Sequence, residues 1–340
     1  MKQKVILITG SSGFIGSHLC KRLLKLSNFK VIGIDMMNNY YSKKLKEDRL
    51  KNIIRNTKDK NNFKFFKIDI TKYNELKNIF TKFKPDIVVN LAAQAGVRNS
   101  LSNPQKYLNY NIKGFLNIIE LSKKFNVLKL IYASTSSVYG LNKPPFKEKY
   151  LIDQPLQFYA VTKRTNELMA HTWSSLYKIN TIGLRFFTVY GPWGRPDMAL
   201  FKFVKNIYEG KPIDVYNFGN HVRDFTYVDD IINGIENSIK IDSKKLFNKK
   251  LMSNSNVPSI VFNLGSGKNI KLLNFIKIIE KELGKKAVIN YLPLQKGDVH
   301  SSLADIKRAQ KFLNYNPIIR PEIGIKKFID WFSGYYDLKI

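Results

Sequence analysis

The stretch KVILITGSSGFIGSHL, residues 4–19, decides the fold class of this 340-residue chain. It starts with a continuous apolar run, which predicts a strand buried on both faces, and passes through a glycine-rich turn into a helical pattern. Gly10, Gly13 and Gly16 have the spacing GxxGxxG. The first glycine permits a tight turn, the second lets a pyrophosphate approach the backbone, and the third lets helix and strand pack closely. We therefore predict a dinucleotide site with its phosphates at the helix N-terminus. A purely structural turn is the alternative.

An acid at the end of the next strand indicates which dinucleotide is bound. Asp35 closes the predicted strand 30–35, and a carboxylate there accepts hydrogen bonds from an adenosine ribose and repels a 2′-phosphate. We therefore expect NAD rather than NADP. Asp69, at the end of the third strand, is expected near the adenine, although it could equally cap that strand. The residues expected to bind the cofactor are Gly10, Gly13, Phe14, Ile15, Gly16, Asp35, Asp69, Ile70, Leu91, Ala92, Ala93, Asn111, Tyr159 and Lys163.

Strand and helix patterns alternate through the first half of the chain. Apolar runs at 5–9, 30–35, 63–70, 86–93 and 128–136 predict strands, and the clearest helix between them spans about 104–125. This rhythm predicts an α/β, Rossmann-like fold with a doubly wound parallel sheet. We expect residues 1–190 to form the NAD-binding domain and 191–340 a smaller substrate-binding lobe, from which some segments return to the first domain. Residues 244–259 are expected to be an exposed loop.

Composition excludes several classes of protein. One cysteine allows no internal disulfide, and the four histidines have no metal-ligand spacing, so we predict no metal site. No stretch approaches the roughly 18 apolar residues of a membrane span, and the short apolar start has no cleavage-type segment. We expect a cytoplasmic protein. The net charge of +31 comes from lysines spread along the whole chain, so nucleic-acid binding is not expected to be its role.

A second group of residues carries the predicted chemistry. Four consecutive hydroxyl side chains, 134–137, lie at a strand's carboxyl end, where ligands of open α/β sheets bind. Tyr159 and Lys163 follow in FYAVTKRTNELMAH (158–171), one helical turn apart and therefore on one face. An ammonium and a nicotinamide cation beside the phenol would lower its pKa and let it accept a proton. A solvated aromatic–cation pair is the alternative.

The combination of these motifs resembles the extended short-chain dehydrogenase/reductase family, and within it the UDP-glucuronate 4-epimerases. The resemblance covers nearly the full chain and is most specific in GPWGRPDMA (191–199). It implies reversible oxidation at carbon 4 of a UDP-sugar by bound NAD, converting UDP-glucuronate to UDP-galacturonate. The implied catalytic residues are Tyr159 as the base, Lys163 as its partner and the ribose ligand, Thr135 on the sugar oxygen, and Ser136. No acid follows Thr135, which argues against dehydration and decarboxylation.

The resemblance also implies where the sugar nucleotide binds. Arg195 is the first choice for the sugar carboxylate, because a guanidinium can bind a carboxylate through two hydrogen bonds. Arg98 and Arg185 are weaker candidates, and Arg185 could equally be structural. A capped turn for Asp298 and a surface ion pair for Arg223 are the structural alternatives. The residues expected to bind the substrate are Ser137, Arg98, Thr188, Arg195, Val215, Tyr216, Arg223 and Asp298.

Three other functions stay open at this point. The chain could epimerise a neutral or N-acetylated UDP-hexose, consume NAD as a dehydrogenase, or bind NAD without chemistry. By analogy with the family we also expect a homodimer, formed through helices near 104–125 and 157–178.

Overall fold

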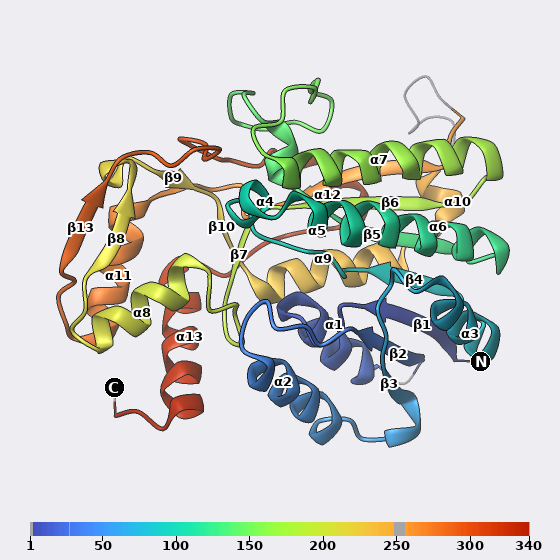
Figure 1. Ribbon diagram of the computed structural model, residues 1–340, viewed down its shortest axis with the longest axis horizontal. Coiled ribbons are helices and arrows are strands. Elements are labelled where there is room, and N and C mark those ends of the chain that lie inside the picture. The colour runs from blue at the N-terminus through green and yellow to red at the C-terminus, as the bar shows by residue number, and fades with distance from the viewer. Residues whose placement is uncertain (1–2, 27, 248–255, 340) are drawn as a thin grey trace.

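A parallel sheet lies at the centre of the computed structural model, which describes residues 3–26, 28–247 and 256–339 (Figure 1). Seven strands of the described chain form it, in the order β11–β6–β5–β4–β1–β2–β3. This order places β1 and β4 side by side, with the chain winding outward in both directions from them. The predicted doubly wound, Rossmann-like α/β fold is therefore confirmed. The strands are β1 (Lys4–Thr9), β2 (Phe29–Asp35), β3 (Phe63–Lys67), β4 (Ile87–Asn90), β5 (Lys129–Thr135), β6 (Thr181–Phe186) and β11 (Ser259–Leu264).

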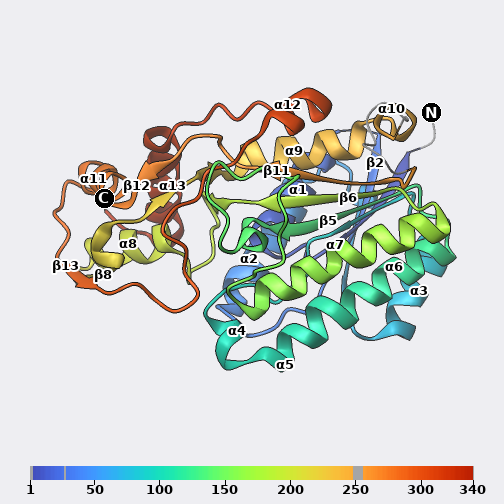
Figure 2. The same ribbon diagram turned by 90° about the horizontal axis from the view of Figure 1, so that it is seen from above.

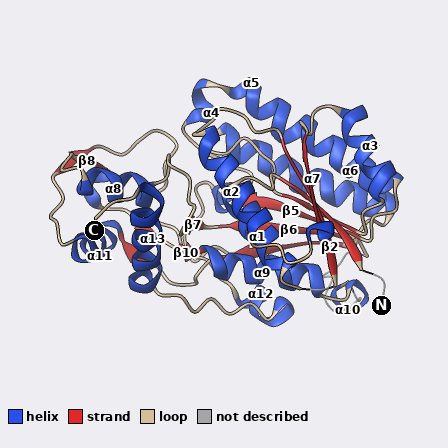
Figure 3. Cartoon of the chain, turned by 90° about the horizontal axis from the view of Figure 1, so that it is seen from below, coloured by secondary structure: helices blue, strands red, loops and turns tan. Residues whose placement is uncertain are grey.

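Helices cover both faces of the sheet (Figures 2 and 3). On one face lie α1 (Phe14–Leu24) and α9 (Val228–Lys240), with α2 (Lys43–Arg55) packed against α1. On the other lie α3 (Tyr73–Phe83), α6 (Gly114–Lys124) and α7 (Phe158–Tyr177). The apolar run of β1 serves both layers, because Ile6 and Ile8 belong to one hydrophobic cluster and Leu7 to the other. Within the described ranges, no helix combines the length and apolarity needed to cross a membrane.

A smaller lobe stands beside the sheet, on the left in Figure 1. It contains α8 (Ala199–Tyr208), the parallel pair β8 (Ile213–Tyr216) and β13 (Ile289–Leu292), α11 (Leu272–Leu283) and α13 (Pro321–Tyr336). The chain passes between the lobes through a short parallel pair, β7 (Thr188–Tyr190) and β10 (Phe225–Tyr227). Later segments return to the sheet, since β11 pairs with β6 and α12 (Lys307–Leu313) packs on β11. Minor elements are η1 (Lys60–Asn62), η3 (Ser136–Tyr139), η4 (Asn217–Gly219), β9 (Val222–Arg223) and β12 (Ile270–Lys271).

The helix predicted near 104–125 is interrupted. It consists of α5 (Pro104–Tyr107), a π-helical segment η2 (Leu108–Lys113) and α6, and a short helix α4 (Asn99–Ser102) precedes it. Such π-helical turns occur often at functional sites. Here the π segment carries Asn111, whose side chain bonds both the N–H and the C=O of Gln94. The third strand also differs from the prediction, because β3 ends at Lys67 instead of residue 70.

The prediction of an exposed loop at 244–259 is wrong at its start. Helix α10 (Ser243–Leu246) begins there because the Asp242 carboxylate accepts a hydrogen bond from the N–H of Lys244, 2.9 Å away. Leu246 is buried, which sequence polarity did not reveal. At the other end Ser259 already belongs to β11. Residues 248–255 lie outside the described part of the chain.

Candidate active site

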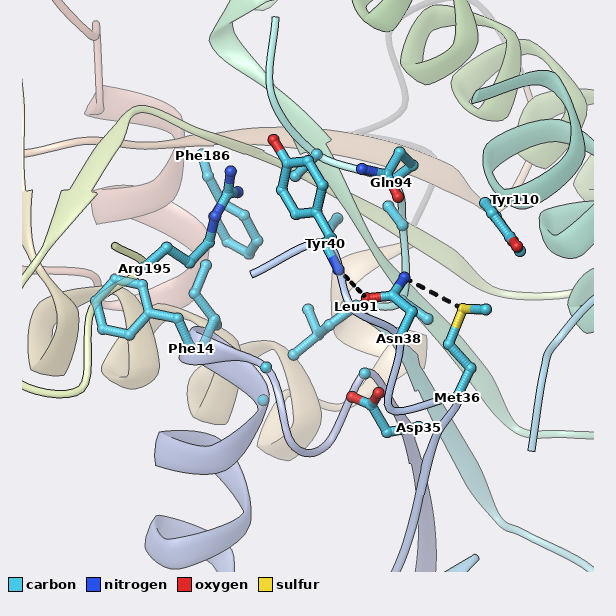
Figure 4. Close-up of a pocket in the computed structure, with 18 of the residues that line it drawn as sticks. Phe14, Asp35, Met36, Asn38, Tyr40, Leu91, Gln94, Tyr110, Phe186 and Arg195 are labelled. Carbon is cyan, nitrogen blue, oxygen red and sulfur yellow. Dashed lines mark hydrogen bonds between the residues drawn. The ribbon is translucent and has the colours of Figure 1, made fainter. Parts of the chain in front are cut away.

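A cavity of about 270 Å³ lies at the carboxyl ends of the central strands (Figure 4). In open α/β sheets this edge is where ligands bind. Its wall includes the glycine-rich turn at one end and the Tyr159 region with Arg195 at the other. The residues predicted from sequence that line it are Gly10, Gly13, Phe14, Ile15, Gly16, Asp35, Ile70, Leu91, Ala92, Ala93, Thr135, Tyr159, Lys163 and Arg195.

The glycine-rich turn has space for a dinucleotide, and its free backbone N–H groups can bind one. Gly10 has φ +68°, and a Cβ there would lie 2.9 Å from the backbone nitrogen of Ala92. A Cβ at Gly16 would overlap the carbonyl oxygen of Gly10. Helix α1 begins with Gly13 as its N-cap and no side chain caps its first amides. Those amides therefore remain available to a phosphate.

Asp35 closes the adenosine end of the cavity. One carboxylate oxygen accepts from the N–H of Ser12 at 3.2 Å and the other from the N–H of Met37 at 2.9 Å. Burial raises the pKa of Asp35, against the lowering effect of these amides and of the Lys46 and Arg49 charges. Each oxygen keeps a second lone pair that a ribose hydroxyl can use. These residues fit the adenosine half of NAD.

The reacting end of the cavity brings Tyr159, Lys163 and Thr135 together. Helix α7 presents Tyr159 and Lys163 on one face toward the end of β5. Lys163 is not among the groups that shift the pKa of the Tyr159 phenol in the protein alone. Burial raises the pKa of Tyr159, and the influences that lower it are the Arg195 guanidinium and the Thr135 hydroxyl. Burial also lowers the pKa of Lys163 to about 8, because desolvation disfavours its ammonium.

Arg185 does not bind a substrate carboxylate in this arrangement. It is 2 % exposed and forms two hydrogen bonds with Glu167, Nε to Oε1 and Nη2 to Oε2, both at 2.8 Å. Its Nη1 donates to the Tyr139 hydroxyl at 3.0 Å. With all three nitrogens engaged inside the protein, Arg185 is structural, the alternative left open by the sequence.

Arg195 lies at the cavity with part of its guanidinium unused. Its Nε and Nη2 bond the two carboxylate oxygens of Asp197 at 3.0 and 2.5 Å. The Tyr40 ring lies 5.6 Å from the guanidinium carbon, and the Tyr40 hydroxyl donates to Asp197 at 3.3 Å. Among the described residues Nη1 has no protein acceptor, so this nitrogen can bind an anionic ligand.

The loop that carries Arg195 is fixed by a buried arginine from the other lobe. Arg49 of α2 is 1 % exposed and donates to the backbone carbonyls of Trp193 at 2.6 Å and Gly194 at 3.2 Å. The same guanidinium donates to the Tyr41 hydroxyl and to the carbonyl of Ser12 in the glycine-rich turn. One side chain thus connects the cofactor-binding turn to the Arg195 loop.

A second cluster gathers four of the predicted substrate residues from distant segments. Arg98 lies 3.5 Å from the Asp298 carboxylate and 4.7 Å from the centre of the Tyr216 ring. Arg223 donates to the carbonyls of Val299 and His300 at 2.6 and 2.9 Å. Two guanidinium groups, a carboxylate and an aromatic ring are a suitable set for a diphosphate, a ribose and a base. Arg223 does not form the surface ion pair considered as its alternative.

Several predicted residues do not line the main cavity. Asp69 caps its strand end by accepting from the N–H of Thr71 at 2.8 Å, and Asn111 is committed to Gln94 and Thr162. Ser137 lies next to the cavity without lining it, because its hydroxyl accepts a hydrogen bond from Thr135, which does line it. Val215 is fully buried in the core of the smaller lobe, and Thr188 lines a small adjoining cavity. The predicted residues outside the main cavity are Asp69, Asn111, Ser136, Ser137, Arg98, Thr188, Val215, Tyr216, Arg223 and Asp298.

Sequence reasoning missed other parts of the wall. Tyr40, Gln94 and Phe186 also line the cavity (Figure 4). Gln94 is 5 % exposed, and its side-chain nitrogen has no partner among the described residues. A glutamine inside the small-residue run LAAQAG was the available signal. Tyr40 carried no comparable signal, because the loop after β2 has no fixed pattern.

With this geometry established, comparison with known proteins identifies the family. Residues 6–246 match the model of the NAD dependent epimerase/dehydratase family. The chain belongs to this family. It is therefore an NAD-dependent enzyme of the epimerase type, which confirms the expected cofactor and agrees with the fit of the glycine-rich turn and Asp35.

Individual relatives match over almost the whole chain. Protein CapI of Staphylococcus aureus is 50% identical, with 97% of this chain and 99% of that protein aligned. The UDP-glucuronate 4-epimerase of Thermodesulfobacterium geofontis is 44% identical over 96% of this chain and 95% of that protein. A solved UDP-glucuronic acid 4-epimerase from Bacillus cereus, in complex with UDP-glucuronic acid and NAD, superposes with a TM-score of 0.88. It is 34% identical and covers 98% of this chain and 100% of the other.

Proposed function

We propose that this protein interconverts UDP-glucuronate and UDP-galacturonate by reversible oxidation at carbon 4 of the sugar. The observation that carries the proposal is Arg195, a cation with a free nitrogen at the same end of the cavity as Tyr159 and Thr135. A neutral hexose has no group that needs such a cation, whereas a uronate has a carboxylate next to the reacting carbon. The names of the related epimerases support the same substrate.

The chain's own side chains supply the proton transfer and the positioning. Gly10, Asp35 and Lys163 would hold NAD, which would supply reversible hydride transfer at carbon 4 of the sugar. Tyr159 takes the proton of the carbon-4 hydroxyl and later gives it back, while Thr135 hydrogen-bonds the same oxygen. The raised pKa of the free Tyr159 means that deprotonation needs help from positive charge. Arg195 supplies part of it, and Lys163 holds the ribose hydroxyls of the cofactor at the same time.

Arg195 also protects the intermediate. The 4-keto uronate is a β-keto acid, which loses carbon dioxide when its carboxylate is aligned with the carbonyl π system. A guanidinium fixed by Asp197 holds the carboxylate in one orientation. At the other end of the substrate, Arg98, Arg223 and Asp298 anchor the nucleotide, so the keto sugar can turn about its diphosphate without leaving.

The test is turnover by the purified protein with no added NAD. We expect UDP-glucuronate to reach an equilibrium mixture with UDP-galacturonate, with no net NADH, and much slower reaction of UDP-glucose and UDP-N-acetylglucosamine. Preference for a neutral or N-acetylated sugar would reject the uronate assignment. Steady accumulation of NADH would point to a dehydrogenase, and absence of turnover with all three sugars would reject an epimerase.

We further propose that the enzyme is a homodimer joined through α6 and α7, which lie side by side at the surface (Figure 2). Val161, Leu168 and Leu176 are exposed along α7, and Leu116 is exposed on the adjacent α6. Their spacing on α7 places them on one stripe. A second copy of the chain, related by a twofold axis, would cover this stripe with the same residues.

A further inference from the structure

We propose that Glu167 is a positioning residue of the reaction: it is the buried anion that keeps Lys163 charged and holds the Thr135 end of β5 against α7. The inference rests on the proposed function, because it assigns a partner to the lysine of that same site. Glu167 does not line the cavity and so has no direct contact with substrate or cofactor.

Glu167 connects α7, which carries Tyr159 and Lys163, to the end of β5, which carries Thr135. It lies on α7 one turn beyond Lys163 and is 4 % exposed. Ser134, the residue before Thr135, donates its hydroxyl to Oε1 of Glu167 at 2.7 Å. Arg185 on β6 binds both carboxylate oxygens at 2.8 Å. The end of β5 is therefore fixed to the helix that presents the phenol and the ammonium.

The charge balance shows why an anion is needed there. Lys163 is 2 % exposed and Glu167 is 4 % exposed, and the two residues lie one turn apart on the same face of α7, so the carboxylate opposes the loss of the Lys163 proton. The other titratable groups around Glu167 do not supply negative charge. Tyr159 on α7 and the buried Tyr132 on β5 are neutral when protonated, and Arg164 on α7 and Arg185 on β6 are cations. Removing the carboxylate leaves Lys163 in a buried site with cations as its charged neighbours.

The same neighbours keep Glu167 ionised. Burial raises the pKa of Glu167, but the Arg185 hydrogen bonds and charge, with the Ser134 hydroxyl and Arg164, outweigh burial and hold that pKa below its ordinary value. The network continues through Tyr139, whose hydroxyl donates to Asn263 on β11 at 2.7 Å. Glu167 is thus held in place and ionised by groups on three elements, β5, β6 and α7.

The test is the pH dependence of kcat for Glu167→Gln, with the sugar that the wild type turns over. The amide keeps the size of the side chain and removes its charge. We expect kcat to fall about tenfold or more with KM for the sugar nucleotide little changed, and the alkaline limb of kcat to move to lower pH by about one unit. A residue with a merely structural role would lower the yield of folded enzyme and leave the alkaline limb unmoved.

Two further variants keep the result interpretable. Glu167→Asp restores the charge and should return the alkaline limb toward its wild-type position. The double variant with Glu167→Gln and Arg185→Met removes the unpaired buried arginine, which could unfold the single variant, and it should still show the shifted limb. An unshifted limb in a folded Glu167→Gln or double variant overturns the inference. Absence of turnover by the wild type would instead count against the proposed function.

Discussion

The guanidinium of Arg195 is bound at two points by the carboxylate of Asp197, two residues further along the same loop. Tyr40, from the loop after β2, supports the pair with a hydrogen bond to Asp197 and a ring beside the guanidinium. The pair leaves Nη1 as the nitrogen that faces a ligand, and it places a positive charge where it lowers the pKa of Tyr159. Arg195 thus has two expected effects, one on the substrate and one on the catalytic phenol.

Replacing Arg195 should damage the reaction of the uronate more than that of a neutral sugar. For Arg195→Met we expect kcat/KM for UDP-glucuronate to fall by about 10² or more. The lost charge-assisted hydrogen bond is worth roughly 1.5–3 kcal/mol. In addition, Tyr159 loses a positive charge that favours its deprotonation. The measurement is kcat/KM for UDP-glucuronate and UDP-glucose, with product analysis for decarboxylated sugar. Asp197→Asn is the matched control and should give a smaller loss of the same kind. Equal losses for both sugars would contradict a carboxylate contact.

Tyr159→Phe should remove the proton transfer and spare the binding. The variant loses one hydroxyl in a cavity that otherwise keeps its shape, so kcat should fall by about 10²–10⁴ while NAD stays bound. Steady-state kinetics and the NAD content of the purified variant measure the two effects. Tyr107→Phe is the control, because that ring contacts Tyr159 edge-on at 6.1 Å and has no proposed chemical role. A Tyr159→Phe enzyme with wild-type kcat would contradict the mechanism.

The pH profile should reflect the lowered pKa of Lys163. Its ammonium is lost as pH rises through about 8, so we expect kcat of the wild type to decline above that pH. The unfolded chain holds this proton up to about pH 10.4, so it binds more protons than the native state between about pH 8 and 10.4. The contribution of Lys163 to the free energy of unfolding of the NAD-free protein should therefore increase as the pH rises across that window. Thermal unfolding of wild type and Lys163→Met at pH 7 and 9.5 checks the sign, because the variant should lose this increment.

Asp224 should stabilise the folded protein through its hydrogen bonds and take no part in catalysis. It is fully buried, and its carboxylate accepts hydrogen bonds from Thr226, from Ser266 and from the N–H groups of Gly267 and Ala304. Asp224→Asn turns one acceptor into a donor that faces these donors, so we expect a loss of about 3 kcal/mol in the free energy of unfolding. Urea denaturation measures it, and Asp229→Asn is the surface-side control. An unchanged midpoint for Asp224→Asn would contradict this role.

A charge on the exposed stripe of α7 should break the proposed dimer. Leu168 is 52% exposed, so Leu168→Lys costs little in the isolated chain but places buried ammonium groups in the twofold interface. We expect sedimentation to show a monomer for this variant and a dimer for the wild type. Leu151→Lys, at a position that is 83% exposed and outside helices α6 and α7, is the control. A wild-type protein that sediments as a monomer would reject the dimer.

Local sequence patterns predicted the sheet and the cofactor end of the site. The glycines of the first turn and Asp35 have roles set by backbone conformation and strand position, both of which sequence spacing encodes. The structure places Gly10, Gly16 and Asp35 at the cavity accordingly.

Roles that depend on which side chains meet across the fold could not be read in the same way. Arg185 is separated from Glu167 by a helix end and a turn, so its pairing was invisible to spacing arguments. Asn111 sits in a π-helical segment that a 3.6-residue periodicity cannot indicate. The pKa of Tyr159 also depends on the cost of burying the phenol, which packing sets and which the distance between two residues in a helix does not give.

The anchoring of Trp193 and Gly194 by Arg49 has a consequence for how substrate enters. Because this buried arginine also holds Ser12, the base of the loop next to Arg195 cannot move away from the pyrophosphate region without breaking several hydrogen bonds at once. The Arg98–Asp298 contact is longer, at 3.5 Å, and the Arg98 side chain is half exposed, so we expect motions that admit a ligand to cost less there. A ligand that enters from that side would leave the hydrogen bonds between Arg49, Ser12 and the Arg195 loop intact.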